Sequence, residues 1–303
     1  MTNNPRVLVT GGAGFIGSHL VELLLAHRYQ VRVLDNLSYG FREWVAEGAE
    51  FLEGDIQDLE TCRRACDGCK GVFHMAAMSR SAASLDNIEI CTSANVLGTQ
   101  NVLVAAKDAG IAKVVYSGSS TYYGNRPAPH TEDLPGDFLN FYGLTKYVGE
   151  EYCLMFDKLY GLPSVVLRYF NVYGPRQPEE GVYALVLGIF LRRAAEGKPL
   201  VIHGSGDQRR DFIHVRDVAA ANLAAFESPA HGVRINVGSG ESISVKELAD
   251  MISDRQEFQP RRRGDAEITL AEISRARELI AWTPRISFRE GIEELSRQTP
   301  LTA

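Results

Sequence analysis

A tyrosine and a lysine four residues apart form the pattern in this sequence best suited to proton transfer. Among the 12 tyrosines, only Tyr142 is followed at that spacing by a lysine, Lys146. Both fall in the first turns of a helix predicted to begin near Phe141, and a spacing of four places them on one face. A phenol with a pKa near ~10 is a poor base, but a neighbouring ammonium and a positive nicotinamide ring lower that pKa. Tyr142 is therefore a candidate for removing a proton from a hydroxyl group while a nicotinamide cofactor takes the hydride.

A serine-rich segment gives this interpretation independent support, which it needs because the Tyr-Lys spacing is common by chance. Residues 114–121 form an apolar run that leads into clustered hydroxyl side chains. Open α/β sheets bind ligands at the carboxyl ends of their strands, so Ser119 could share a proton with Tyr142 and the reacting hydroxyl. The alternative is a turn whose serines bond only to their own backbone.

A glycine-rich segment, Gly11-Gly12-Ala13-Gly14-Phe15-Ile16-Gly17, has the spacing of a dinucleotide-binding turn. It follows an apolar strand, residues 6–10, and opens a helix over residues 15–27. Glycines allow the tight turn and the close approach of a pyrophosphate, which then lies at the helix N-terminus. The motif in this context predicts a dinucleotide cofactor.

Two carboxylates indicate which dinucleotide is preferred. Asp35 ends the second predicted strand and can accept both hydrogen bonds from an adenosine ribose, whereas it would repel a 2′-phosphate. NAD is therefore expected rather than NADP. Asp55 either meets the adenine edge or caps the following helix, and both interpretations stay open.

The predicted elements that position these residues alternate between strand and helix. Strands are expected at 6–10, 31–34, 50–53, 71–74, 113–117 and 164–168, with helices at 15–27, 59–66, 90–109 and 141–160. This order is typical of a parallel sheet covered by helices on both faces, the α/β class. After Phe170 prolines and glycines interrupt shorter elements, and strands at 212–215 and 233–237 are candidates for returning to the first sheet. Ser244-x-x-Glu247 is a capping box that opens a short helix over 245–253, and the last helix is expected at 288–297.

Length and charge exclude several classes of protein. A chain of 303 residues is long enough for one large domain or two fused ones. Its net charge of −6 argues against a nucleic-acid partner, which needs a basic face. No apolar stretch approaches the ~20 residues of a membrane span, and no signal peptide is apparent, so a cytoplasmic protein is expected.

Three cysteines, Cys62, Cys66 and Cys69, have the spacing of some iron–sulfur ligands. The same spacing places all three on one face of the predicted helix, where free cysteine behaves as a small buried apolar side chain. We expect the buried face, and therefore no metal.

The sequence resembles the extended short-chain dehydrogenases/reductases, and most closely their nucleotide-sugar members of the UDP-glucose/UDP-galactose 4-epimerase type. The resemblance covers nearly the whole chain. It rests on Gly11–Gly17, Asp35-Asn36, Gly54-Asp55-Ile56, His74-Met75-Ala76-Ala77, Asn95-Val96-x-Gly98-Thr99, Ser117-x-Ser119, Thr121-x-Tyr123-Gly124, Tyr142-x3-Lys146, Arg168–Pro175, Gly204-x-Gly206-x3-Arg210-Asp211-Phe212 and Arg262-x-Gly264-Asp265.

The resemblance implies a Rossmann-type doubly wound parallel sheet that binds NAD, with a smaller α/β C-terminal domain that binds a UDP-sugar. It divides the chain into an NAD-binding domain, 1–170 plus 209–238, interleaved with a nucleotide-sugar-binding domain, 171–208 plus 239–303.

The implied catalytic residues are Ser119, Tyr142 and Lys146. The implied cofactor-binding residues are Gly11, Gly14, Phe15, Ile16, Gly17, Asp35, Asn36, Asp55, Ile56, Met75, Ala76, Ala77, Asn95, Ser117, Tyr142, Lys146 and Tyr169. The implied substrate-binding residues are Ser119, Asn171, Val201, Ile202, His203, Arg210, Arg262 and Asp265. Arginine is a permanently charged, forked donor that suits a diphosphate, although Arg210 could instead pair with Asp207 or Asp211.

Departures from related families favour plain 4-epimerisation. Sugar 4,6-dehydratases carry an Asp-Glu pair where this chain has Ser120-Thr121, and uronate decarboxylases keep a glutamate at the Thr121 position. Those two activities stay as alternatives, and a non-catalytic NAD-binding regulator is a third, less favoured alternative. Thr269, a small residue, would admit an N-acetyl group beside the sugar, whereas Arg80 would suit a uronic acid.

The resemblance also predicts a homodimer formed through the helices at 90–109 and 141–160. The second helix has an apolar row, which could equally face the sheet. That row is Val148, Tyr152, Met155, Phe156 and Leu159.

Overall fold

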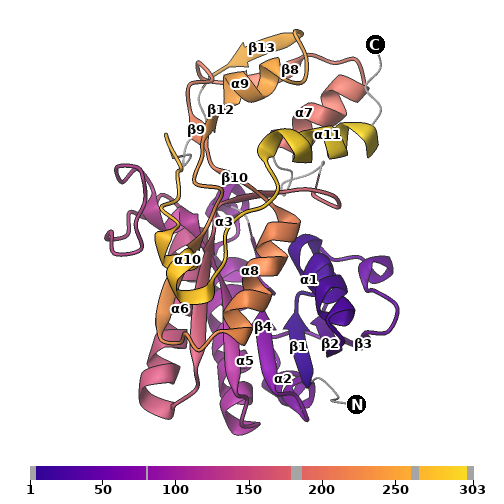
Figure 1. Cartoon of the computed structure of the whole chain (residues 1–303), viewed down its shortest axis with the longest axis vertical. Helices are drawn as coiled ribbons and strands as arrows, with labels where there is room; N and C mark the ends of the chain where they lie inside the picture. The colour runs from indigo at the N-terminus through magenta and orange to yellow at the C-terminus, as the bar shows by residue number, and fades with distance from the viewer. Residues whose placement is uncertain (1–4, 80, 179–185, 261–265, 299–303) are drawn as a thin grey trace.

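A seven-stranded parallel sheet forms the centre of the computed structural model, which describes residues 5–79, 81–178, 186–260 and 266–298 (Figure 1). The strand order is β11-β6-β5-β4-β1-β2-β3. The strands are β1 (Arg6–Thr10), β2 (Gln30–Asp35), β3 (Glu50–Glu53), β4 (Gly71–His74), β5 (Lys113–Ser119), β6 (Ser164–Tyr169) and β11 (Val233–Val237). The order reverses between β1 and β4, and such a switch point is where ligands bind in open α/β sheets.

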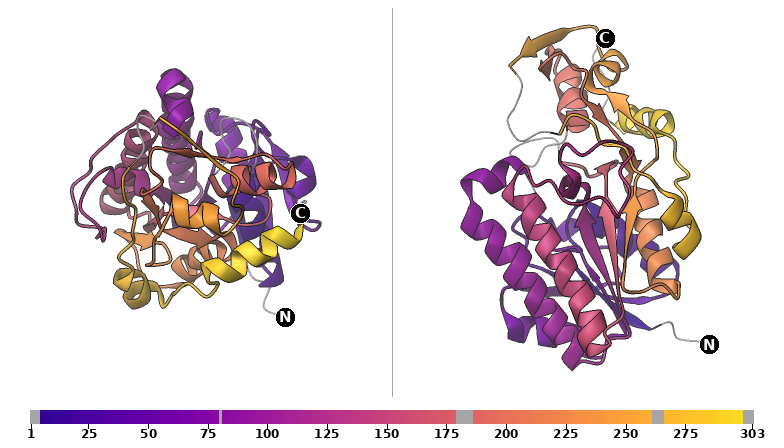
Figure 2. Two further views of the ribbon diagram at one scale, coloured as in Figure 1. Left: turned by 90° about the horizontal axis from the view of Figure 1, so that it is seen from above. Right: turned by 90° about the vertical axis from the view of Figure 1, so that its left-hand side faces the viewer.

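Helices cover both faces of the sheet, as the alternating sequence pattern predicts. Val7 and Val9 pack with α1 (Phe15–Ala26) and α8 (Val215–Glu227), whereas Leu8 packs toward the opposite face. That opposite face is covered by α2 (Leu59–Cys66), α5 (Gly98–Asp108) and α6 (Phe141–Tyr160), and Figure 2 shows α5 and α6 side by side there. Burial on both faces explains why the strands read as continuous apolar runs.

The three cysteines at and after α2 are buried, as expected, but Cys69 lies beyond the end of the helix and not on its face. Cys62, Cys66 and Cys69 belong to the core between α2, α5 and the sheet. Burial raises the pKa of the Cys66 thiol to about 12, which keeps it protonated. No cluster of potential metal ligands occurs in the described part of the chain.

The helix expected at 90–109 is not uniform. It consists of α4 (Ile88–Thr92), a π-helical turn η2 (Ser93–Leu97) and then α5. A π turn holds more residues per turn than an α-helix and is often found at functional sites. The prediction of a single regular α-helix is therefore wrong, and the irregularity lies at Asn95.

A smaller α/β region lies beyond the carboxyl ends of the central strands (Figure 1). Its strand pairs are β7 (Asn171–Tyr173) with β10 (Phe212–His214), β8 (Leu200–His203) with β13 (Gln256–Gln259), and β9 (Arg209–Arg210) with β12 (Ile243–Ser244). Its helices are α7 (Val186–Ala195), α9 (Val245–Asp250) and α11 (Phe288–Gln298). Ser244 and Glu247 form the predicted capping box at α9. None of the helices in the described ranges is long and apolar enough to cross a membrane.

Only one of the two late strands returns to the central sheet. β11 pairs with β6, as expected, but β10 pairs with β7 and does not join the large sheet. The expectation for Phe212 was wrong because its ring packs with Tyr173 and Phe288 in the core of the smaller region. The division of the chain into 1–170 plus 209–238 and 171–208 plus 239–303 stays a prediction.

Candidate active site

The glycine-rich turn is too closely packed for any other residue at two positions. Gly11 has φ +72°, and a Cβ there would lie 2.7 Å from the backbone nitrogen of Ala76. A Cβ on Gly17 would lie 2.1 Å from the carbonyl oxygen of Gly11. Helix α1 therefore packs directly on the turn, with Gly14 as its N-cap and Phe15 and Ile16 in its first turn. This geometry presents a helix N-terminus, which favours an anion such as a pyrophosphate.

Asp35 is held rigidly at the end of β2. One carboxylate oxygen accepts the N–H of Ala13 at 3.0 Å and the other accepts the N–H of Leu37 at 2.9 Å. Burial raises the pKa of this carboxyl, while the two N–H groups oppose that shift by stabilising its charge. A fixed carboxylate at this point suits a ribose diol.

Asp55 is not the cap of α2, so that alternative is wrong. Asp58 caps the helix instead, accepting the N–H groups of Glu60 and Thr61. Asp55 accepts a 2.7 Å hydrogen bond from the side-chain amide of Asn36. The contact of Asp55 with an adenine edge stays a prediction. The neighbouring Ile56 is buried against Gly98, on which a Cβ would lie 2.5 Å from the Ile56 side chain.

A buried hydrogen-bond network joins the end of β1 to the segment that follows β4. Thr10 accepts the N–H groups of Met75 and Ala76, each at 3.2 Å, and bonds the ring of His74 at 2.8 Å. Ala77 continues this segment and is half-buried.

Asn95 links the segment that follows β4 to α6. Its side-chain amide donates to Met78 O and to Thr145 Oγ1, each at 3.0 Å, and its oxygen accepts the N–H of Met78 at 2.8 Å. Asn95 thus connects the segment after β4 to the helix that carries Tyr142 and Lys146.

Tyr142 and Lys146 lie in the first two turns of α6, whose bounds are those predicted. Asn140 caps the helix by accepting the N–H of Gly143 at 2.9 Å. The ring of Tyr142 packs against a small cluster that includes Met78 and Cys91. The Lys146 ammonium is buried 4.2 Å from the centre of the Tyr116 ring, and burial lowers the pKa of Lys146 to about 8.

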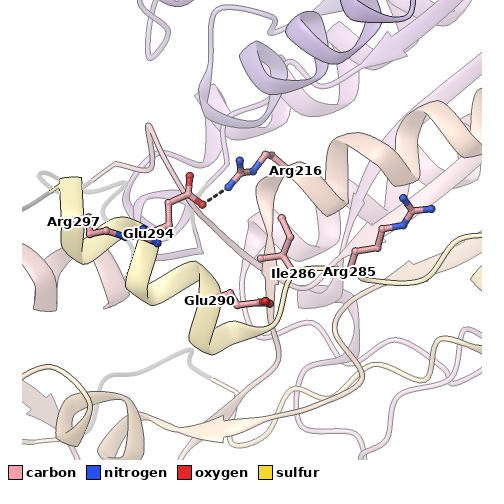
Figure 3. A pocket seen from close by; sticks show the side chains of 6 residues that line it. All are labelled: Arg216, Arg285, Ile286, Glu290, Glu294 and Arg297. Atoms are coloured by element: carbon pink, nitrogen blue, oxygen red, sulfur yellow. Dashed lines mark hydrogen bonds and ion pairs between the residues drawn. The ribbon is translucent and has the colours of Figure 1, made fainter.

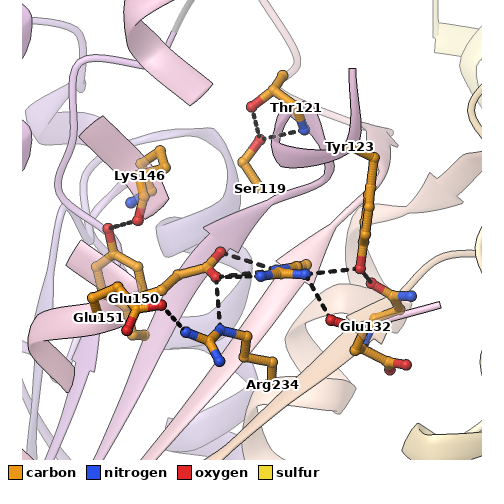
Figure 4. Close-up of polar contacts among 11 residues, drawn as sticks. Ser119, Thr121, Tyr123, Glu132, Lys146, Glu150, Glu151 and Arg234 are labelled. Carbon is orange, nitrogen blue, oxygen red and sulfur yellow. Dashed lines mark hydrogen bonds and ion pairs between the residues drawn. The ribbon is translucent and has the colours of Figure 1, made fainter. Parts of the chain in front are cut away.

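Ser119 closes β5 and begins the short helix η3 (Ser120–Tyr123). Its hydroxyl lies 2.8 Å from Thr121 Oγ1 and accepts the N–H of Thr121 at 3.3 Å (Figure 4). Ser119 thus bonds a backbone N–H group of its own turn, as the alternative interpretation expected. It also lies at the carboxyl end of β5, where the catalytic interpretation requires it. On β5 and β6, Ser117 and Tyr169 share a 3.1 Å hydrogen bond, and Tyr169 donates to Asn222 at 2.8 Å.

The predicted substrate residues lie in the smaller region. The Asn171 amide donates to Asp211 O and to Thr269 Oγ1, each at 2.9 Å. Arg210 donates to the carbonyl of Arg209 at 2.9 Å. The Asp211 carboxylate is instead occupied by the N–H groups of Ser239, Gly240 and Ala271, so the alternative Arg210–Asp211 pair is not formed.

Three further predicted substrate residues lie on β8. Val201 and His203 are half-buried on this strand, Ile202 between them is in the core, and His203 bonds Pro260 O at 3.1 Å. Arg262 and Asp265 lie outside the described residues, as does Arg80.

Sequence reasoning missed three contacts that support the predicted site. Tyr116 provides the ring beneath Lys146, Ser84 accepts the N–H of Tyr142 at 3.1 Å, and Thr269 holds Asn171. All three depend on side chains far apart in the chain, so spacing alone gives no signal for them.

The larger of two hollows in the described part of the chain does not contain the predicted chemistry. It has a volume of about 740 Å³ and lies between the start of α8 and α11, lined by Arg216, Arg285, Ile286, Glu290, Glu294 and Arg297 (Figure 3). Its charges are mixed, and none of the predicted site residues lines it. The smaller, about 180 Å³, includes Tyr39 and Met78 and so borders the segment that follows β4. We therefore place the candidate site at the carboxyl ends of β1, β4 and β5, on the strength of the side-chain geometry.

Comparison with known proteins assigns a family to most of this chain. Residues 7–238 match the model of the NAD dependent epimerase/dehydratase family. A putative UDP-glucose 4-epimerase of Methanocaldococcus jannaschii is 38% identical over 298 residues, which are 95% of this chain and 96% of that protein.

Solved structures are similar over nearly the whole chain. The UDP-glucose 4-epimerase of Thermotoga maritima, solved with UDP-glucose, matches with a TM-score of 0.92 and 34% identity, covering 97% of this chain and 99% of that one. The UDP-N-acetylglucosamine 4-epimerase of Methanobrevibacter ruminantium M1, solved with UDP-N-acetylmuramic acid, matches with a TM-score of 0.91 and 33% identity, covering 98% and 100%.

Proposed function

The chain belongs to the NAD-dependent epimerase/dehydratase family, and we propose that it interconverts the C4 epimers of a UDP-hexose. The observation that carries this proposal is the placement of Tyr142 and Lys146 on α6, beside the end of β5 where Ser119 lies, at one edge of a dinucleotide-binding sheet. Relatives named as UDP-sugar 4-epimerases support the same reaction.

The residues at the carboxyl ends of the strands fit NAD. Gly11 and Gly17 leave no room for side chains where a pyrophosphate would approach, and Asp35 presents a buried carboxylate that would oppose a 2′-phosphate. When bound there, NAD supplies a reversible hydride acceptor next to C4 of the sugar. We also propose that NAD is held by the residues after β4 and by Asn36, Asp55, Ser117 and Tyr169.

The protein's own residues would handle the proton. Tyr142, as the phenolate, removes the proton of the C4 hydroxyl, and Ser119 shares that hydrogen bond. The Lys146 ammonium favours the phenolate, because an adjacent positive charge stabilises the negative form. After the 4-keto sugar has rotated to present its opposite face for reduction, Tyr142 returns the proton to the C4 oxygen.

The lack of carboxylates after Ser119 favours this outcome over the alternatives. Residues 120 and 121 are serine and threonine, and Thr121 bonds Ser119. Elimination of water or loss of carbon dioxide would need further acid–base groups at this point. We therefore propose that the 4-keto sugar is reduced again without any other change.

A purified sample incubated with UDP-glucose and no added NAD tests the proposal. UDP-galactose should accumulate until the two sugars reach equilibrium, since the cofactor is regenerated in each cycle. A 4-keto-6-deoxy product would assign the chain to the dehydratases, and bound NAD without turnover of any UDP-sugar would indicate a binding protein. A parallel series with UDP-N-acetylglucosamine and UDP-glucuronate would identify the sugar.

A homodimer is the proposed assembly. Helix α6 packs Tyr152 and Phe156 of the predicted apolar row against the core, but it also exposes apolar side chains. Its buried face includes the charged residues Lys146 and Glu150, whereas Met155 and Leu159 are 51% and 60% exposed. The neighbouring α4 adds Ile90, which is 56% exposed. Exposed apolar side chains on neighbouring helices suit an interaction site. A sedimentation mass of one chain at micromolar concentration would reject the dimer.

A further inference from the structure

A fully buried ion pair joins β6 to α6 below the candidate site. The Arg168 guanidinium contacts the Glu150 carboxylate through Nη2 at 2.8 Å and through Nε at 3.0 and 3.2 Å, and both side chains are excluded from solvent. Glu150 lies one helical turn after Lys146. Buried charges are costly unless geometry is good and all groups are satisfied, so this pair requires an explanation.

The same guanidinium reaches the segment that follows Ser119. Its Nη1 donates to Tyr123 Oη at 3.0 Å, and the group lies 3.7 Å from the centre of the Tyr122 ring. Tyr123 in turn donates to Asn236 of β11 at 2.7 Å (Figure 4). Arg168 therefore holds η3 with one side of its fork and α6 with the other.

The carboxylate of the pair also touches the strand that carries Ser119. A Cβ on Gly118 would lie 2.8 Å from Glu150 Oε1, so the strand approaches Glu150 at the residue immediately before the serine. The first turn of α6 packs on η3 as well, since a Cβ on Gly143 would lie 3.1 Å from Thr121 O. The ion pair thus lies between the two elements that carry Ser119 and Tyr142.

We propose that Arg168, together with Glu150, is a positioning residue that fixes Ser119 relative to Tyr142 and Lys146 for proton transfer. The inference rests on the proposed function for the roles of those three residues. Arg168 touches no reacting group and acts through η3 and α6. The planar fork is essential, because a lysine ammonium is a point charge that cannot hold both elements in one fixed geometry.

The test compares Arg168→Lys with a matched variant, Arg234→Lys. Arg234 contacts the same Glu150 carboxylate at 3.3 Å and also pairs with Glu151, and both of these carboxylates belong to α6. Both substitutions keep the positive charge. Turnover of the UDP-sugar is measured per molecule of bound NAD, so that a loss of folded protein does not count.

Misplacement of a reacting group by about 1 Å can cost roughly 10²-fold in rate. We therefore expect turnover per bound NAD to fall by about 10- to 100-fold in R168K, with the KM for the UDP-sugar within about twofold of wild type. R234K should keep its turnover within about twofold. Equal turnover in R168K and R234K, or a loss in R168K that is confined to KM, would overturn the inference.

A crystal structure of R168K provides a readout that does not need activity. Helix η3 should be displaced relative to α6 while the central sheet is unchanged, and an unmoved η3 would overturn the inference. If wild-type protein turned over no UDP-sugar, the proposed function would fail, but this structural comparison would still decide whether Arg168 sets the two elements.

Discussion

The buried imidazole of His74 should make the stability of this protein depend on pH in a calculable way. His74 ends β4, and its two ring nitrogens bond Thr10 Oγ1 at 2.8 Å and Thr99 Oγ1 at 3.0 Å. Burial, with a smaller contribution from the positive charge of Lys146, lowers the pKa of His74 to about 3. The folded protein therefore keeps this ring neutral at pH 5, whereas the unfolded chain, with a pKa of about 6.5, takes up a proton.

The sign and size follow from that difference. Because the unfolded state binds more protons below pH 6.5, the stabilisation is fully present above that pH and is lost as the pH falls toward the folded-state pKa. A pKa difference contributes about 1.4 kcal/mol per pH unit, so the loss between pH 7.5 and pH 5 is about 2 kcal/mol. The result does not depend on the folded value as long as it lies well below 5.

Urea unfolding of wild type and His74→Gln at both pH values measures this effect. The comparison with a variant is needed because burial raises the pKa of Asp35 and Asp211, and these groups change stability with the opposite sign. The stability difference between wild type and His74→Gln should be about 2 kcal/mol smaller at pH 5 than at pH 7.5. A difference that stays constant between the two pH values would refute the assignment of a neutral buried His74.

Substitutions at four further positions test the site and the smaller region. Tyr142→Phe should lower turnover at least ~100-fold with NAD content and substrate KM nearly unchanged, and retention of more than a tenth of wild-type turnover would disprove its role as the base. Lys146→Met should lower turnover and also the NAD retained after gel filtration, because it removes both the charge beside the phenolate and a proposed cofactor contact. Thr269→Val should raise the UDP-sugar KM about fivefold, since the Asn171 amide loses an acceptor worth about 1 kcal/mol, whereas Thr269→Ser should match wild type. Ser244→Ala should lower the unfolding free energy by about 1 kcal/mol in urea, and a change in turnover there would argue against a purely local cap.

The regular elements and the residues at their ends could be predicted from the sequence. Continuous apolar runs mark strands buried on both faces, and the helices at 59–66 and 141–160 have the predicted bounds. Motifs that follow a strand directly, such as Gly11–Gly17, lie where a parallel sheet must place them. These patterns depend on near neighbours in the chain, which is why they can be recognised without a structure.

What could not be predicted depends on pairings over long distances. Strand β10 is only three residues long, and its apolar pattern suits either sheet. Arg168 and Glu150 are charged residues within a strand and a helix, and nothing in their spacing indicates that they meet in the core. Tyr123, close to Ser119 in the sequence, is unsuited to act as the base, because its hydroxyl is buried and bonded to Arg168 and Asn236 and its pKa is raised to about 12.

The π turn at residues 93–97 limits how the length of this chain can change. Cys91, Asn95 and Thr99 are all buried, at intervals of four residues. In a regular α-helix each such step would rotate the side chain by about 40° away from the one before, whereas here Asn95 lies near Cys91 Sγ and both side chains contact Thr145 Oγ1. Deleting one residue there would restore a regular helix but rotate Asn95 away from Met78 and Thr145. Length variation in this helix should therefore be excluded during divergence, even where it would improve helical geometry.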